Sequence, residues 1–156
     1  MSAAHAAHAP CSRSQQLGGV LQEAGKLEDA LLHFESAVSL NFKVFGGVHK
    51  RTLMSMNDLA SLFYEMGRLE QALPLYVTVV AANRELLGVR HGDYLAVLFN
   101  LAQLLMDQGE LLKAEHLFAE ACQTAEEVLG PDHPSTLMYK ASFKEVKKRQ
   151  LKKGKI

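Results

Sequence analysis

Apolar residues along this chain recur three or four positions apart, which is the spacing of one face of an α-helix. Residues 56–63 show the pattern most clearly, with Met56, Leu59, Ala60 and Phe63 on one face. Gly67 then interrupts the pattern, as a glycine at the end of a helix does. A second apolar stripe follows over residues 69–80. Residues 51–92 therefore predict two helices joined by a short turn.

The same pair of stripes returns later in the chain, over residues 98–105 and 111–122. Equivalent residues lie 42 positions apart, and a fixed period is typical of a helical-repeat fold. Six sets of residues share this step: Leu17, Leu59 and Leu101; Gly25, Gly67 and Gly109; Ala30, Ala72 and Ala114; Phe34, Tyr76 and Phe118; Gly46, Gly88 and Gly130; His49, His91 and His133. The period predicts three units of two helices each.

We therefore expect an all-α fold, an α-α superhelix of three helix pairs followed by a C-terminal capping helix. The repeat domain is predicted to span 12–146, with units at about 11–50, 51–92 and 93–134 and a partial cap at 135–146. Residues 1–11 are expected to form a flexible segment, and 147–156 a basic tail. Neighbouring units bury apolar surface between them in such arrays.

Small and large residues alternate in the repeat for a packing reason. Gly18, Ala60 and Ala102 are expected to let the two helices of a pair approach closely. Phe34, Tyr76 and Phe118 are expected to fill the space between adjacent units. Cys122 falls in the same set as Val38 and Val80, which predicts a buried structural thiol.

The residues Leu59, Ala60, Phe63, Gly67, Ala72 and Tyr76 match the pattern of the tetratricopeptide repeat (TPR) family, which the chain resembles over about 12–146. The 42-residue period, the loop LGPDHPST (129–136) and the phrases at 56–76 and 99–118 resemble the kinesin light chain subtype. The resemblance implies a TPR solenoid and a non-catalytic scaffold that binds other proteins. A fragment of a kinesin light chain-like motor adaptor is an alternative.

In TPR arrays the first helix of each pair lines a concave groove, so the resemblance implies a candidate binding site for a partner segment. Its residues are Gln15, Gln16 and Glu23 in the first unit; Asn57, Asp58, Ser61, Tyr64 and Glu65 in the second; Phe99, Asn100, Gln103, Met106 and Asp107 in the third. This lining has acidic residues and no Lys or Arg. We expect it to prefer neutral or basic peptide segments over acidic ones, or to be an ordinary solvated surface.

Charge is distributed unevenly along the chain, although the net charge is zero. Residues 1–139 hold 16 acidic and 9 basic side chains, whereas residues 140–156 hold 8 basic side chains and one acidic. The tail's basic residues include Lys147, Lys148, Arg149, Lys152 and Lys153. A solvated cap is one interpretation; an anionic partner (nucleic acid, membrane surface or tubulin), a nuclear import signal, or inhibition by folding back onto the acidic groove are the alternatives.

The sequence contains no pattern that indicates catalysis or metal binding. His49, His91 and His133 are expected in separate loops, where each helps to start the next helix, because units stack about 8–10 Å apart and zinc needs ligands at about 2 Å. The two cysteines, Cys11 and Cys122, form no CxxC pair. No enzyme motif, cofactor or small-molecule substrate is indicated.

The chain lacks an apolar run long enough for a membrane span and an ordinary secretory signal. Both observations favour a cytoplasmic location, with organelle import as the alternative.

Overall fold

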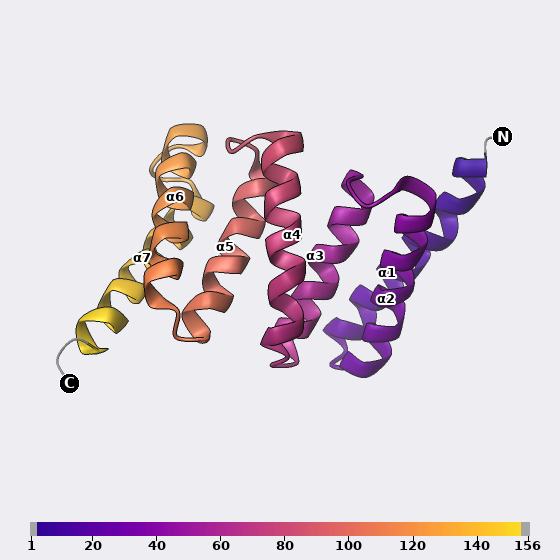
Figure 1. Ribbon diagram of the computed structural model, residues 1–156, viewed down its shortest axis with the longest axis horizontal. Coiled ribbons are helices and arrows are strands. Elements are labelled where there is room, and N and C mark those ends of the chain that lie inside the picture. The colour runs from indigo at the N-terminus through magenta and orange to yellow at the C-terminus, as the bar shows by residue number, and fades with distance from the viewer. Residues whose placement is uncertain (1–2, 154–156) are drawn as a thin grey trace. The chain divides into compact units, whose positions relative to one another are not determined.

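The computed structural model describes residues 3–153, and the side chains of residues 12–153. This part of the chain forms seven α-helices and no strand (Figure 1). The helices are α1 (Ala3–Glu23), α2 (Leu27–Phe45), α3 (Lys50–Glu65), α4 (Leu69–Leu87), α5 (Gly92–Asp107), α6 (Leu111–Leu129) and α7 (Pro134–Lys153). The predicted all-α fold of three helix pairs and a C-terminal helix is confirmed.

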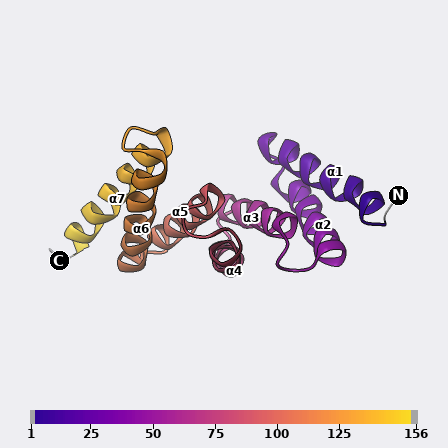
Figure 2. The same ribbon diagram turned by 90° about the horizontal axis from the view of Figure 1, so that it is seen from above.

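The chain divides into two compact units, residues 1–75 and 76–156. In the first unit α1 packs against α2, and α2 packs against α3. In the second unit α6 packs against both α5 and α7, and Figure 2 shows α6 and α7 side by side as Figure 1 does. Each first helix therefore lies next to a second helix, as the repeat requires.

The two ends of the described chain are more helical than the sequence analysis proposed. Residues 3–11, expected to be flexible, belong to α1, and the strong helix propensity of its alanines accounts for this. Residues 147–153 of the expected tail continue α7 without a break. Residues 1–2 and 154–156 of these two segments lie outside the described residues.

Glycines end the first helices of the repeat because the turn there needs a positive φ. Gly67 has φ +73° and Gly109 has φ +82°, values that residues with a Cβ rarely adopt. After Gly67, the Arg68 amide donates to the Phe63 carbonyl at 2.8 Å, and the Gly67 amide donates to the Tyr64 carbonyl at 3.0 Å. This Schellman pattern satisfies carbonyls that the end of α3 would leave unpaired.

The repeated histidines begin the first helices, as predicted. Nδ1 of His49 accepts from the Arg51 amide at 3.2 Å at the start of α3. His91 accepts from the Asp93 amide at 3.1 Å at the start of α5, and His133 accepts from the Ser135 amide at 3.2 Å at the start of α7. Each imidazole pairs an amide that has no partner within its helix.

The helices of the first unit approach closely at Gly18, whose main chain lies against the ring of Phe34. A Cβ built on Gly18 would lie 3.0 Å from Cδ1 and Cε1 of Phe34. Phe34 is almost fully buried, together with Ala30 and Ala37 of α2. The expectation that a small residue at this position permits close approach is confirmed.

Two neighbouring glycines of α1 should respond oppositely to replacement by alanine. Gly19→Ala should raise the free energy of unfolding by about 0.5–1 kcal/mol, because a helix gains propensity and nothing lies within 4 Å of the added Cβ. Gly18→Ala should lower the free energy of unfolding by about 1 kcal/mol, because crowding of the new Cβ against Phe34 outweighs the gain in helix propensity. Urea unfolding followed by circular dichroism measures both; equal gains would contradict the close packing of α1 on α2.

The core of the second unit joins α5, α6 and α7 through Tyr94, Leu98, Cys122 and Tyr139. The hydroxyl of Tyr94 donates to Glu120 at 2.6 Å, which links α5 to α6 inside this core. Burial and the bond to Glu120 raise the pKa of Tyr94 to about 12. The predicted burial of Cys122 is confirmed, with 8% of its surface exposed.

Candidate functional site

In the first unit, two glutamines of α1 reach carboxylates of α3. The side-chain amide of Gln15 donates to Asp58, and that of Gln22 donates to Glu65 at 2.6 Å. The sequence predicted Asp58 and Glu65 for the binding site and missed the role of Gln22. Donor and acceptor are 43 residues apart in each pair, so their contact follows from the stacking of α1 beside α3.

Asp58 is a half-buried carboxylate whose charge is supported by its neighbours. Burial raises the pKa of Asp58 above its ordinary value, while hydrogen bonds from Gln15 and Asn57 act in the opposite direction. Burial is the larger influence. As the pH falls, Asp58 therefore loses its charge earlier than an exposed aspartate does.

Asn57, beside Asp58, has an acceptor that the fold does not use. Its Oδ1 is buried and has no hydrogen-bond partner among the described residues. A buried polar atom without a partner is unfavourable by about 1–3 kcal/mol.

The other predicted residues of the first unit differ in exposure. Gln16 and Glu65 are exposed, whereas Ser61 and Tyr64 are half-buried. All of them belong to α1 or α3, the two first helices of this unit.

In the second unit, the predicted residues lie on α5 and include a mixture of surface and core. Asn100 and Gln103 are half-buried. Asp107 is exposed and forms an ion pair with Arg149 of α7, with Oδ1 and Nη1 3.4 Å apart. The ring of Phe99 stacks on Tyr139 with centroids 4.9 Å apart and lies 5.6 Å from the ring of Phe118. Phe99 therefore contributes to packing between helices as well as to the surface.

Met106 requires a correction, because the expectation that it lines an open groove is wrong. Only 4% of its surface is exposed. Met106 follows Leu98 and Ala102 at intervals of four residues, so it lies on the same buried face of α5 as they do. Its side chain is unavailable to a partner in this conformation.

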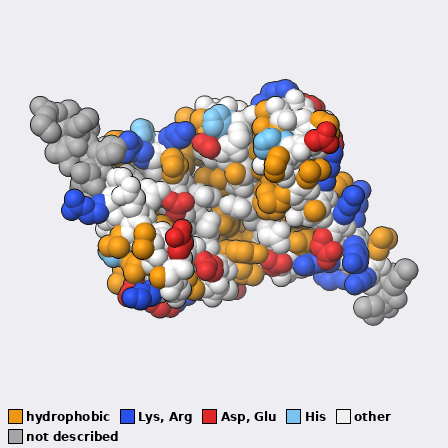
Figure 3. Space-filling model, turned by 180° about the vertical axis from the view of Figure 1, so that it is seen from behind, with side chains coloured by type: hydrophobic (Ala, Val, Ile, Leu, Met, Phe, Trp, Pro, Cys, Tyr) orange, Lys and Arg blue, Asp and Glu red, His pale blue; other side chains and the backbone are white. Residues whose placement is uncertain are grey.

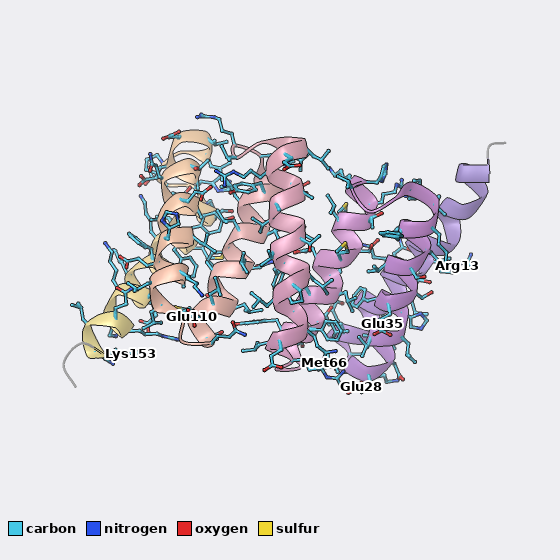
Figure 4. All side chains as sticks on the ribbon, viewed as in Figure 1. Arg13, Glu28, Glu35, Met66, Glu110 and Lys153 are labelled. Carbon is cyan, nitrogen blue, oxygen red and sulfur yellow. The ribbon has the colours of Figure 1, made fainter. Side chains whose placement is uncertain are left out.

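The basic end of α7 makes several contacts inside the second unit. Arg149 pairs with Glu145 as well as Asp107, and Nζ of Lys147 lies 4.3 Å from the centroid of the Phe143 ring. Lys153 donates to the carbonyl of Gly109 at 3.2 Å, in the turn before α6 (Figure 4). These contacts hold the end of α7 alongside α5 and α6.

The same helix end also carries exposed lysines. Lys144, Lys147, Lys148 and Lys152 surround Leu151 and line a shallow pocket of about 340 Å³. Figure 3 shows Lys and Arg side chains gathered near the C-terminal end of α7. Three of these lysines occupy positions at which α5 has buried residues: Lys144 matches Ala102, Lys147 matches Leu105 and Lys148 matches Met106. We call this the lysine face of α7.

A second pocket lies in the first unit, where the start of α3 meets α1 and the end of α2. Its volume is about 520 Å³, and it is lined by Ser12, Gln15, Asn41, His49, Lys50, Arg51 and Met54. Asn41 is buried and donates to Ser55 at 3.2 Å, while its Oδ1 has no partner among the described residues. Sequence reasoning missed this pocket, because its residues come from three helices and share no motif.

Side chains that could hold a metal ion do not gather in the described part of the chain. Among the side chains of residues 12–153, no three His, Cys, Asp or Glu residues are placed to hold a metal ion. Burial, followed by the charge of Glu126, raises the pKa of the Cys122 thiol to about 11, which disfavours the reactive thiolate. No helix in residues 3–153 is long and apolar enough to cross a membrane.

Comparisons with known proteins match the chain to one repeat family. Two family models, both described as tetratricopeptide repeat, match residues 9–85 and 95–135. No curated protein matches the sequence. The matched residues include α2, α3 and α6 in full, together with most of α4 and α5.

Solved structures with similar folds include other helical-repeat proteins. A putative kinesin light chain with nearly identical TPR-like repeats from Podosopora anserina has a TM-score of 0.82 and 24% identity, covering 88% of this chain and 66% of that one. BtubC (BKLC) from P. vanneervenii has a TM-score of 0.68 and 15% identity, covering 90% and 64%. The N-terminal domain of stress-induced protein-1 from C. elegans has a TM-score of 0.64 and 16% identity, covering 94% and 99%. The chain thus spans about two thirds of the first two.

Proposed function

Because the chain belongs to the tetratricopeptide repeat family, we propose that it is a scaffold that binds a segment of a partner protein on the first helices of its repeats. Proteins of this family generally bind other proteins and are non-catalytic. In the first unit the proposed binding face consists of Gln16, Asn57, Asp58, Ser61, Tyr64 and Glu65. In the second unit it includes Phe99, Asn100, Gln103 and Asp107, without Met106.

The observation that carries the proposal is the unpaired Oδ1 of Asn57 beside two glutamine-bound carboxylates. An extended segment presents a backbone N–H at every residue except proline. Such a segment on α3 would supply the donor that Asn57 lacks, once the side-chain amide, whose Oδ1 is buried in the free chain, turns towards the surface. Gln15 and Gln22 would hold Asp58 and Glu65 in place, so that little side-chain order is lost on binding.

The charges of this face support a preference for neutral or basic segments. Asp58 and Glu65 are both on α3, and the glutamines bound to them are neutral. A lysine or arginine of the partner would therefore meet carboxylates, whereas an acidic side chain would be repelled.

The proposal is tested with two fluorescent pools of short random peptides, one enriched in Lys and one in Glu. Fluorescence anisotropy should show tighter binding of the Lys-rich pool. Asp58→Asn with Glu65→Gln should weaken that binding about fivefold, taking about 0.5 kcal/mol for each of the two charge pairs. Both amides keep an oxygen that accepts from Gln15 or Gln22, so the fold should be unchanged.

A matched control is Glu35→Gln, which removes an exposed carboxylate from α2 of the same unit (Figure 4). It should leave the affinity of the Lys-rich pool unchanged. Lowering the pH should weaken binding of this pool by the wild type, because burial raises the pKa of Asp58 and this carboxylate loses its charge at a higher pH than an ordinary aspartate does. Tighter binding of the Glu-rich pool, or an equal loss in Glu35→Gln, would refute the proposal.

A second candidate function is attachment to an anionic partner through the lysine face of α7. The exposed lysines around Leu151 favour it. Binding of this kind releases counterions, so its affinity falls steeply with added salt. The same titrations identify this second function by two results. Binding of the Glu-rich pool should vanish at high salt, and it should be unchanged in the variant Asp58→Asn with Glu65→Gln.

A further inference from the structure

Helix α1 exposes apolar residues at positions that the other first helices bury. Val20 is 61% exposed, whereas the residues that match it in α3, α5 and α7, Leu62, Leu104 and Val146, are all fully buried. Leu17 is 43% exposed, whereas the matching Leu59 and Leu101 are 7% and 6% exposed. The repeat itself therefore marks Leu17 and Val20 as positions meant for contact.

The first helices that bury the matching residues also pack on the helix that precedes them in the chain. Helix α3 packs on α2, and α7 packs on α6. The helices in contact with α1 lie on its other sides. Gly18 contacts Phe34 of α2, and Gln15 and Gln22 donate hydrogen bonds to α3. Among the described residues, no helix lies over Leu17 and Val20. We call these two residues the open face of α1.

Charges at the two ends of the open face indicate which helix would fit there. Arg13 lies four residues before Leu17, and Glu23 lies three residues after Val20 (Figure 4 labels Arg13). Both side chains are exposed, and within residues 12–153 neither forms an ion pair. A helix with the opposite order of charges would pair with both, and an antiparallel copy of α1 has that order.

We propose that two copies of this chain associate through antiparallel packing of their α1 helices. The pairing places Leu17 of each copy against Val20 of the other, and Arg13 of each copy near Glu23 of the other. At about 1.5 Å rise per residue, Arg13 and Glu23 lie about 8 Å and 7 Å on either side of the midpoint between Leu17 and Val20, so their levels match. A parallel pair would instead bring like charges together.

Such a pairing is isologous, because the same surface serves both partners. Leu17 and Val20 supply the apolar centre, and the charged residues form its rim, as in other protein interfaces. The proposal goes beyond partner binding, which is tested at Asp58 and Glu65 of α3. Glu23 was also expected to line the groove, so Val20→Asp, outside that set, is the variant that separates self-association from peptide binding.

Sedimentation equilibrium of the whole chain over a wide range of concentration tests the proposal. As the concentration increases, the average mass of the wild type should rise from 17.2 kDa, the mass of one chain, towards twice this value. Val20→Asp should weaken association at least tenfold, because an isolated carboxylate would be buried at the centre of the pair. The residue is exposed in the single chain, so helical content by circular dichroism should not change.

Exchange of the two charges tests the antiparallel arrangement itself. Arg13→Glu alone and Glu23→Arg alone should each weaken self-association at least tenfold, because each creates two like-charge pairs. An equimolar mixture of the two variants should restore the wild-type dissociation constant to within about threefold. In that mixed pair, residues 13 and 23 have opposite charges at both ends.

The control is Leu112→Asp, at the most exposed large apolar residue of the second unit, and it should associate like the wild type. A wild-type mass that stays at 17.2 kDa at the highest concentration overturns the proposal and leaves the open face to a helix of another origin. If the equimolar mixture of Arg13→Glu and Glu23→Arg stays monomeric, the antiparallel pairing is wrong.

Discussion

Replacing Phe118 with alanine should lower the free energy of unfolding by about 3–5 kcal/mol, the usual loss for a fully buried phenylalanine. No part of the Phe118 side chain is exposed, and its ring contacts Phe99 of α5 with centroids 5.6 Å apart. The neighbours on its own helix, Ala114, Ala121 and Ala125, are too small to fill the space left behind. Most of the cavity should therefore persist.

This loss is large beside a typical stability of about 5–15 kcal/mol for a folded domain. Urea unfolding followed by circular dichroism measures it, with Leu112→Ala as the control on the same helix. Leu112 is 78% exposed, so its replacement should change the stability by no more than about 0.5 kcal/mol. A loss below about 1 kcal/mol for Phe118→Ala would show that α5 and α6 do not depend on this ring.

The thiol of Cys122 should react with a disulfide reagent at least about 100-fold more slowly in the native protein than in concentrated urea. Burial raises its pKa from 9.0 to about 11. Two pKa units correspond to about 100-fold less thiolate, which is the reactive form. Because only 8% of the residue is exposed, limited access should slow the reaction further.

The measurement uses a Cys11→Ser variant, so that Cys122 is the one thiol that remains. The rate of release of the coloured thiol product is followed at a mildly alkaline pH, with and without urea. Tyr139, which packs in the same core, offers a second readout: Tyr139→Ala should open this core and speed the native reaction. Equal rates in the native and unfolded protein would contradict the buried position.

The regular parts of the fold could be predicted because each rests on a local pattern repeated three times. The helical spacing of Met56, Leu59 and Phe63 and the interruption at Gly67 define one helix and its end. The 42-residue step then places Phe34, Tyr76 and Phe118 in equivalent buried positions. The role of the histidines at helix starts was also readable, since each comes directly before a new apolar stripe.

The candidate site could be predicted only in part, because its details depend on contacts between residues far apart in sequence. Gln22 and Glu65 meet because α1 lies beside α3, which no local pattern shows. Met106 was misplaced because it lies at the border between the surface and the buried face of α5, where a rotation of one residue decides exposure. The pairing of Arg149 with Asp107 was missed for a related reason: it depends on the tail continuing α7 as a rigid helix.

The lysine face of α7 limits how large an assembly of this chain can become. A helix packed there, as α6 packs on α5, would have to bury the ammonium groups of Lys144, Lys147 and Lys148, which is strongly unfavourable. End-to-end stacking into an open filament is therefore blocked at this face. Association through α1 uses the same surface on both copies and closes on itself, so the assembly should stop at two chains.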